Sequence, residues 1–253
     1  MNLDLPRFYA AEPGLPFPDR RAVMPWRPQQ PVPPQDIPAQ WQALCQRPLP
    51  ANKRLVYLHI PFCATHCKFC GFYQNKLEAE ATEQYCDYLI REIEQETASS
   101  LHQSAPVHAV YFGGGTPTAL SAKQLHRIII TLRRSLPLAP DCEITVEGRI
   151  LNFDDERIDA CLDAGANRFS IGIQTFDTRI RQRMGRRANR EEAIQFLRKL
   201  GERDRAAVVC DLMFGLPEQT PESWREDLQI IRDLPLDGVD LYALNLLPST
   251  PLG

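Results

Sequence analysis

From residue 55 onward, short hydrophobic runs rich in β-branched residues alternate with stretches whose hydrophobic residues recur at helical spacing. Strands that alternate with helices form parallel sheets, because each helix carries the chain back across the sheet before the next strand begins. Six strands are expected, at residues 55–61, 107–112, 143–146, 168–174, 207–214 and 239–246. The chain is therefore predicted to be α/β, with its sheet either doubly wound or curled into a barrel.

The helical stretches between these strands carry their own start and stop signals. Ser121 followed three residues later by Gln124 predicts a capping box at one helix start. Asn189 is expected to cap another helix, which Gly201 ends. Proline is tolerated in the first turn, so Thr220-Pro221 is expected to open the last helix. Hydrophobic spacing and capping residues thus predict the same order of elements.

The two ends of the chain differ from this regular middle. The first 50 residues hold 12 of the 22 prolines, so residues 1–50 are predicted to be an irregular extension with one short helix near 41–46. Residues 51–253 are expected to form the core domain. Residues 248–253 follow the sixth strand directly, without the helix that should cover it. The barrel is therefore expected to lack its C-terminal elements, as in a shortened chain.

Charge and hydropathy limit where such a chain works and what it binds. The 29 basic and 32 acidic side chains give a net charge of -3, which offers no field for nucleic acid. No hydrophobic run approaches the length of a membrane-spanning helix, and the first residues do not resemble a signal peptide. The prediction is a cytoplasmic protein that binds no nucleic acid and has no membrane span.

Three of the eight cysteines, Cys63, Cys67 and Cys70, form a C-x3-C-x2-C cluster directly after the first strand. Thiolates are the usual ligands of iron–sulfur clusters, and three of them leave one iron of a four-iron cluster open to another ligand. The alternative is a zinc site completed by His66 or Cys86. No second C-x2-C pair accompanies the first, which favours the iron–sulfur cluster. The remaining cysteines are scattered and are expected to be small buried residues: Cys45, Cys86, Cys142, Cys161 and Cys210.

Further polar or glycine-rich positions follow the next four strands. They are the run Gly113-Gly114-Gly115-Thr116-Pro117, then Glu147, Gln174 and Asp211. An isolated carboxylate at a strand end is usually a helix cap or a solvated group. Here all these positions lie at the same end of successive strands, which is also the end where the cysteines lie. In parallel barrels the catalytic residues come from that end of the strands. The run of arginines from 179 to 187 is expected to be mostly solvated, with one or two able to bind a carboxylate.

Five motifs in this order resemble the radical S-adenosylmethionine superfamily, in its branch of oxygen-independent coproporphyrinogen oxidase-like proteins. They are YLHIPFC at 57–63, the three cysteines, GGGTP at 113–117, SIGIQTF at 170–176 and DLMFGLP at 211–217. The resemblance covers residues 55–253. It implies a partial (β/α)6 barrel, which agrees with the strand count.

The resemblance also implies the cofactors and the residues that bind them. Cys63, Cys67 and Cys70 match the ligands of a [4Fe–4S] cluster, whose electron cleaves S-adenosylmethionine to methionine and a 5′-deoxyadenosyl radical. Some members of the branch bind two molecules of S-adenosylmethionine, and Asn245 is a weaker match to a contact of that kind. Positions that match contacts with S-adenosylmethionine are Tyr57, Phe69, Gly114, Thr116, Glu147, Gln174, Arg186 and Asp211.

Within the branch, two local sequences separate the possible activities. Coproporphyrinogen oxidases carry a further cysteine where this chain has Phe72, and haem chaperones tend to read Glu-Ala-Asn-Pro where this chain has EGRI at 147–150. Both sequences are most similar to the anaerobic haem-degrading methyltransferases (the ChuW/HutW group). This similarity implies methyl transfer to haem, ring opening and iron release, with an electron donor such as a flavodoxin or ferredoxin. The alternatives are a coproporphyrinogen oxidase-like dehydrogenase, a haem chaperone without turnover, or a shortened and inactive chain.

Overall fold

The computed structural model describes residues 31–48 and 52–253. The chain divides into two units at the boundary between Ala43 and Leu44. The rest of the predicted extension, residues 1–30 and 49–50, lies outside the described residues. A 3-10 turn, η3 (Pro34–Asp36), leads into α1 (Ile37–Cys45). The predicted short helix is therefore present, but it begins at Ile37 rather than 41. Pro38 does not prevent this, because the first helical N–H groups have no partner within the helix.

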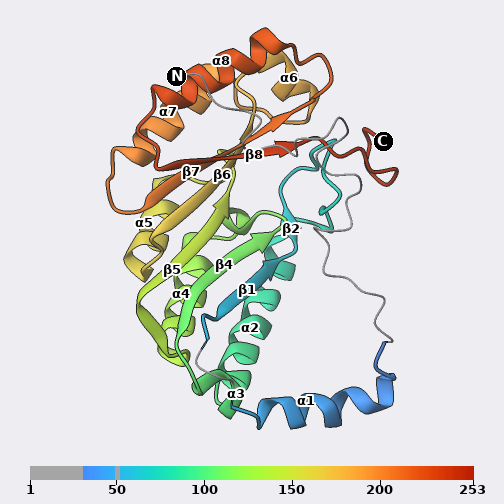
Figure 1. The fold of residues 1–253 in the computed structure, drawn as a ribbon, viewed down its shortest axis with the longest axis vertical. Coiled ribbons are helices and arrows are strands. Elements are labelled where there is room, and N and C mark those ends of the chain that lie inside the picture. Colours follow the sequence, from blue (N-terminus) through green and yellow to red (C-terminus); the bar gives the residue numbers. More distant parts are fainter. Residues whose placement is uncertain (1–30, 49–51) are drawn as a thin grey trace, which may run out of the picture. The chain divides into compact units, whose positions relative to one another are not determined.

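The second unit contains a six-stranded parallel sheet. Its strands in space are β1 (Leu55–Ile60), β4 (Val107–Gly114), β5 (Leu138–Gly148), β6 (Arg168–Gln174), β7 (Ala207–Phe214) and β8 (Gly238–Ala243). Spatial order equals chain order, and β1 and β8 are the two edges (Figure 1). A doubly wound sheet reverses its strand order at a switch point. This sheet does not, so the partial barrel predicted from the sequence is confirmed.

Two strand boundaries differ from the prediction by more than two residues. The strand β5 begins at Leu138, opposite Val107, well before the hydrophobic run that was expected to start it at 143. The strand β8 ends at Ala243 rather than at 246. Ala243 pairs with Phe214, the last residue of the neighbouring strand β7. Strand length is therefore set by the paired neighbour, which the local hydrophobic pattern does not contain.

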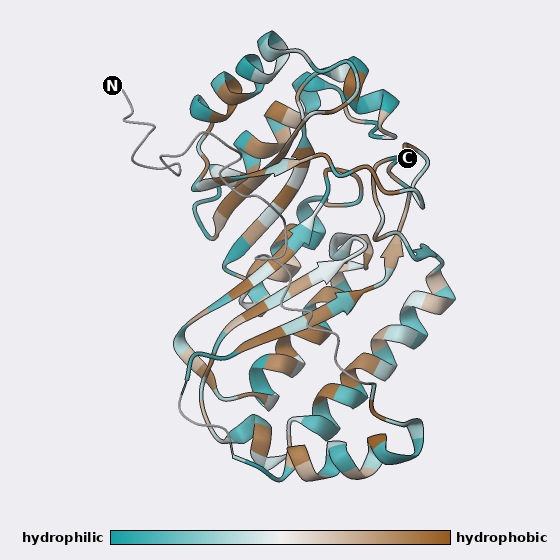
Figure 2. Cartoon of the chain, turned by 45° about the vertical axis from the view of Figure 1, so that its right-hand side comes forward, coloured by the Kyte–Doolittle hydropathy of each residue, from teal (hydrophilic) through white to brown (hydrophobic). Residues whose placement is uncertain are grey.

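Helices cover the outer face of the sheet. They are α2 (Ala79–Glu96), α3 (Ser100–Gln103), α4 (Ala122–Ser135), α5 (Asp155–Ala164), α6 (Thr178–Arg183), α7 (Arg190–Gly201) and α8 (Pro221–Arg232). Alternate strand residues such as Leu58, Phe112 and Phe169 pack with helical residues such as Ile128 and Leu197 in one core. Figure 2 shows these strands as largely hydrophobic, while the helices mix both kinds of residue. No helix among the described residues is long and apolar enough to cross a membrane.

The predicted helix caps are present, with one change. Ser121, Asn189 and Thr220 each accept a hydrogen bond from the backbone N–H three residues on. Gly201 is the last residue of α7, and the residue after it, Glu202, caps the helix in the right-handed helical conformation. The helix is therefore not ended by a glycine in the left-handed conformation. A Cβ at Gly201 would lie 2.1 Å from the Pro235 carbonyl oxygen. This glycine is therefore needed for close packing, and its backbone conformation is ordinary.

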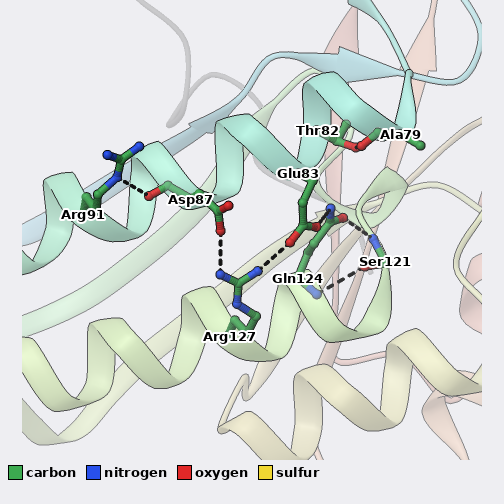
Figure 3. Close-up of polar contacts among 8 residues, drawn as sticks. All are labelled: Ala79, Thr82, Glu83, Asp87, Arg91, Ser121, Gln124 and Arg127. Atoms are coloured by element: carbon green, nitrogen blue, oxygen red, sulfur yellow. Dashed lines mark hydrogen bonds and ion pairs between the residues drawn. The ribbon is translucent and has the colours of Figure 1, made fainter.

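Polar contacts fix how α2 lies along α4 (Figure 3). Arg127 donates to Glu83 at 2.8 Å and to Asp87 at 2.6 Å, while the Gln124 amide donates to the second oxygen of Glu83 at 2.7 Å. Gln124 also closes the capping box by accepting from the Ser121 N–H at 2.8 Å. Exposed ion pairs of this kind stabilise little, about 0.2–1 kcal/mol each. Their main effect is to fix which faces of the two helices meet.

Candidate active site

The carboxyl ends of the central strands surround a cavity of about 160 Å³. Nine of the twelve residues predicted for the site line it. They are Cys63, Cys67, Phe69, Cys70, Thr116, Glu147, Gln174, Arg186 and Asp211. They come from the loop after β1, from the ends of β4, β5, β6 and β7, and, for Arg186, from the segment that follows α6.

The cysteine loop is closed at its base by a small second sheet. Its strands β2 (Phe62–Cys63) and β3 (Asn75–Lys76) pair in parallel, with Leu77 N–H donating to the Cys63 carbonyl at 3.0 Å. The Cys63 Sγ lies 3.4 Å from the Thr116 hydroxyl at the end of the glycine run. Lys68 N–H donates to the Met184 carbonyl at 3.1 Å. The three thiols are thus held against the barrel mouth rather than carried on a free loop.

The zinc alternative lacks its fourth ligand. The His66 ring stacks on Tyr73, with centroids 4.3 Å apart, and its Nε2 lies 3.2 Å from the Cys70 carbonyl oxygen. Cys86 lies on α2 in the core, where burial and then Glu83 raise the pKa of its thiol to about 12. In residues 31–48 and 52–253, no three His, Cys, Asp or Glu side chains are placed to hold one metal ion. A four-iron cluster takes each cysteine on a different iron, so its thiolates stand further apart.

The glycine run brings backbone close to the cysteine loop. Gly115 N–H donates to the Ile60 carbonyl at 2.8 Å, and a Cβ on Gly115 would lie 3.0 Å from the Cys63 Sγ. Gly114 has φ +111°, a conformation that side chains rarely adopt, and a Cβ there would lie 2.8 Å from the His59 ring. Gly114 N–H also donates to the Glu147 carboxylate. Glycine at 114 is therefore required by both the backbone and the space around it.

Replacing Gly114 with alanine should lower the free energy of unfolding by at least about 2 kcal/mol, because the strained backbone and the His59 contact add together. Urea unfolding of the apo chain measures the change. Gly238→Ala is the matched control, because its φ is ordinary and the nearest atom to a new Cβ is Val209 Cγ2 at 3.3 Å. Equal losses in the two variants would contradict this account of Gly114.

Two half-buried carboxylates line the cavity. Glu147 accepts a 2.7 Å hydrogen bond from the Tyr111 hydroxyl, and Asp211 accepts one of 2.9 Å from Ser170 Oγ. Burial raises the pKa of both carboxyl groups above the ordinary value. The charge of Asp211 adds to the rise at Glu147, and that of Asp240 adds to the rise at Asp211. The ionised form of such carboxyl groups is stabilised when a ligand brings hydroxyl, amino or ring N–H donors into the cavity.

The cavity is also lined by an arginine and an amide with unused hydrogen-bonding atoms. Arg186 donates to the Gly172 carbonyl at 2.8 Å, and its guanidinium lies 5.7 Å from the centre of the Phe69 ring. Burial lowers the pKa of Arg186 to about 10, so it stays a cation at neutral pH. Gln174 has φ +69°, and its Oε1 is buried without a partner among the described residues. These atoms fit a ligand that has both a carboxylate and donor groups.

Three predicted site residues do not line the cavity. Tyr57 stands at the exposed edge of β1, near Glu147, and is 58% exposed, while Asn245 is exposed beyond the end of β8. Gly114, the third of these residues, contributes through its backbone N–H and through the bend that its positive φ gives the chain. Sequence reasoning in turn missed several residues that line the cavity: Thr65, Tyr73, Gly148, Arg149, Ser170 and Gly172. Ser170 and Gly172 could have been found, since strand alternation puts them on the same face as Gln174.

An open parallel barrel whose first strand leads into three clustered cysteines, facing carboxylates and a buried arginine, defines a radical S-adenosylmethionine protein. The model of the Radical SAM superfamily matches residues 57–231, and the chain belongs to this superfamily. The superfamily uses a [4Fe–4S] cluster and S-adenosylmethionine. The thiols, the unpartnered amide and the buried arginine of this cavity fit that pair of groups.

Individual relatives carry the comparison further. Over 252 residues the chain is 63% identical to anaerobilin synthase from Escherichia coli O157:H7, covering 100% of this chain and 57% of that protein. It is 33% identical to the heme chaperone HemW from Synechocystis, over 77% of this chain and 48% of the other. Coproporphyrinogen III oxidase (HemN) from Escherichia coli has a similar structure, with a TM-score of 0.73, 30% identity, and coverage of 85% and 49%. The chain spans about half the length of these relatives.

Proposed function

We propose that this chain carries the active site of a radical S-adenosylmethionine enzyme that methylates haem and opens its ring without oxygen, with release of iron. The observation that carries the proposal is the 63% identity to anaerobilin synthase, which extends over 252 residues and so includes every residue of the cavity. Relatives of other activity are much less similar, at 33% identity or below. Phe72 and the EGRI sequence at 147–150 support the same choice.

Cys63, Cys67 and Cys70 are proposed to bind three irons of the cluster, which leaves the fourth iron open. When bound, the reduced cluster supplies the electron that cleaves S-adenosylmethionine. Thr116 and Gly115 bring hydroxyl and backbone against Cys63, and so limit the space beside it. The walls of the cavity exclude bulk water from the site, which protects a reactive species from side reactions.

The remaining predicted residues are proposed to bind S-adenosylmethionine. Arg186 is suited to its carboxylate, since a guanidinium pairs with carboxylate through two parallel hydrogen bonds. Glu147 and Asp211 are suited to its amino and hydroxyl donors, and Gln174 offers its unused Oε1. Tyr57 and Asn245, which stand outside the cavity, are proposed to serve a second molecule at the mouth of the barrel. Phe69, Gly114 and Thr116 complete the set through ring, N–H and hydroxyl contacts.

Substrate, partner, location and domain division belong to the same proposal. The substrate is haem or a related tetrapyrrole, and the electron comes from a small donor such as a flavodoxin or ferredoxin. A site built on three free thiols requires a reducing compartment, for which we propose the cytoplasm. Residues 51–253 are proposed to be the radical S-adenosylmethionine core, with residues 1–50 as an extension of it.

An anaerobic incubation tests the activity directly. The reconstituted chain is mixed with reductant and S-adenosylmethionine, with and without haem, and mass spectrometry follows 5′-deoxyadenosine and tetrapyrrole products. We expect haem to stimulate 5′-deoxyadenosine formation at least tenfold and a methylated linear tetrapyrrole to appear. Stimulation by coproporphyrinogen III instead would identify a dehydrogenase. Haem binding without any 5′-deoxyadenosine would identify a chaperone, and either result would overturn the proposal.

A further inference from the structure

One arginine joins the end of the third barrel strand to the cysteine loop. Arg149 directly follows β5 and is only 8% exposed. Its guanidinium donates twice to Thr65, to the carbonyl oxygen at 3.1 Å and to Oγ1 at 3.1 Å. Its own backbone N–H donates to the buried Thr118 hydroxyl at 3.3 Å. Since Thr65 lies between Cys63 and Cys67, this one side chain bridges the barrel wall and the segment that presents the thiols.

Arg149 also belongs to a buried group of three arginines, with Arg181 at 2% exposure and Arg186 at 8%. Arg181 donates to main-chain carbonyls, including those of Ile173 and Thr175 at 2.7 and 2.8 Å. In the part of the chain that the structure describes, no ion pair joins any of the three to a carboxylate. A buried cation without a counter-charge is strongly destabilising. The nearby carboxylates Asp227 and Asp211 act on Arg181 and Arg186 without forming an ion pair, so the three arginines are only partly offset by negative charge.

The thiols are the groups on which this charge acts. The electrostatic effect of Arg149 reaches Cys63, while Arg186 interacts with Cys67 and Cys70. The Nε atoms of Arg149 and Arg186 are both buried and have no partner among the described residues. Unused donors and positive charge thus lie beside the segment where a thiolate-bound cluster would bring negative charge.

We propose that Arg149 is a positioning residue that fastens the cysteine loop through Thr65 and adds to the positive charge of Arg186 that balances the cluster. The inference rests on the proposed [4Fe–4S] site. Reduction adds one negative charge to the cluster, so a nearby fixed cation stabilises the reduced form and raises the reduction potential. Arg149 therefore has two separable effects, one on the loop without the cluster and one on the cluster itself.

Two variants separate these effects. Arg149→Met removes both the hydrogen bonds and the charge, whereas Arg149→Lys keeps the charge but loses the two-pronged contact with Thr65. Arg183→Met is the matched control, because Arg183 is a half-exposed arginine on α6 that pairs with Glu218 at the surface. Hydrogen exchange of residues 64–70 in the apo chain reports on the loop. A redox titration of the reconstituted chain, followed by electron paramagnetic resonance, reports on the cluster.

For Arg149→Met we expect at least tenfold faster exchange in the loop and at least a tenfold lower ratio of reduced to oxidised cluster at a fixed potential. For a one-electron couple, that ratio corresponds to a shift of about 59 mV toward negative potential. Arg149→Lys should speed exchange but leave the ratio within threefold of the wild type, and Arg183→Met should change neither. If Arg149→Met leaves both measurements unchanged, the inference is wrong.

A second variant keeps the test decisive if Arg149→Met does not fold. Thr65→Val removes the hydroxyl that accepts one of the two hydrogen bonds and keeps the shape of the side chain. It should speed loop exchange several-fold, with the potential of the cluster unchanged, and an unaltered exchange rate would disprove the clamp. A wild-type chain that binds no iron and sulfide would instead refute the proposed function. The apo exchange measurement still tests the clamp in that case.

Discussion

Replacing Cys67 with alanine is expected to abolish both iron–sulfur cluster binding and S-adenosylmethionine cleavage. Cys67 is 6% exposed and lines the cavity between Cys63 and Cys70. Three local cysteines already leave one iron open, so the loss of one more leaves two protein ligands for four irons. No other thiol is placed to substitute, since Cys86, Cys161 and Cys210 lie buried in the helix-packed core. Iron and sulfide content should fall to background, and 5′-deoxyadenosine formation should drop at least a hundredfold.

The matched control is Cys45→Ala, which removes a thiol from the end of α1. Cys45 is half-buried, and its thiol forms a long hydrogen bond of 3.7 Å to Glu96. Reconstituted Cys45→Ala should therefore keep full iron content and full turnover. Circular dichroism of both apo variants shows whether the fold survives. A Cys67→Ala chain that retains four irons would refute the assignment of the three ligands.

Replacing Asp211 with asparagine should weaken binding of S-adenosylmethionine by about 10- to 100-fold, while making the apo chain more stable. The expected loss is that of one hydrogen bond to a charged group, about 1.5–3 kcal/mol. Asparagine keeps the shape and still accepts the hydrogen bond from Ser170 Oγ. Anaerobic titration calorimetry on the reconstituted variant measures the affinity.

The gain in stability depends on pH in a defined direction. Burial, with a contribution from Asp240, raises the pKa of Asp211 above its ordinary value of 3.8. The folded chain therefore binds this proton more tightly than the unfolded chain. Stability from the group is complete below pH 3.8 and is lost as pH rises through the raised pKa. Above neutral pH the variant should melt about 2–4 °C higher, the shift for 1 kcal/mol in a domain of this size. The gain should shrink as pH falls toward 3.8.

Asp240→Asn is the control for both measurements. Asp240 stands opposite Asp211 on β8, but its side chain is 44% exposed and does not line the cavity. Its substitution should change the affinity for S-adenosylmethionine less than threefold, and above neutral pH it should raise the melting temperature by less than Asp211→Asn does, because it removes only the Asp240 contribution to the raised pKa of Asp211. Calorimetric scans of the three chains across pH decide the matter. A variant of Asp211 that loses stability at high pH would show that its charge is not a burden to the fold.

Local patterns in the sequence were enough to predict the class of fold and most of the wall of the cavity. Strand ends in a parallel barrel share one rim, so Glu147, Gln174 and Asp211 could be placed together without coordinates. The spatial order of the strands could not be read in this way, because a doubly wound sheet and a barrel have the same alternating pattern. Nor could the early start of β5, which depends on pairing with β4.

Arg149 shows most clearly what the sequence does not contain. Its neighbours Glu147 and Gly148 mark the end of β5, but nothing local says that the arginine turns inward to reach Thr65, which is 84 positions away in the chain. The same holds for Arg181, a member of an arginine run that was expected to be solvated and that is 2% exposed. Long side chains are placed by distant carbonyl groups, and such contacts leave no periodic trace.

The sequential order of the strands has a consequence for how the protein is made. Each strand of the sheet pairs with the strand that precedes it in synthesis, so the growing chain can add one layer at a time as it leaves the ribosome. Among the residues that line the cavity, the thiols at 63–70 are translated first. The cavity wall is complete only after Asp211 has been translated. Between the translation of Cys70 and that of Asp211 the three thiols therefore face an unfinished site, because the residues that enclose them are spread along that stretch of the chain.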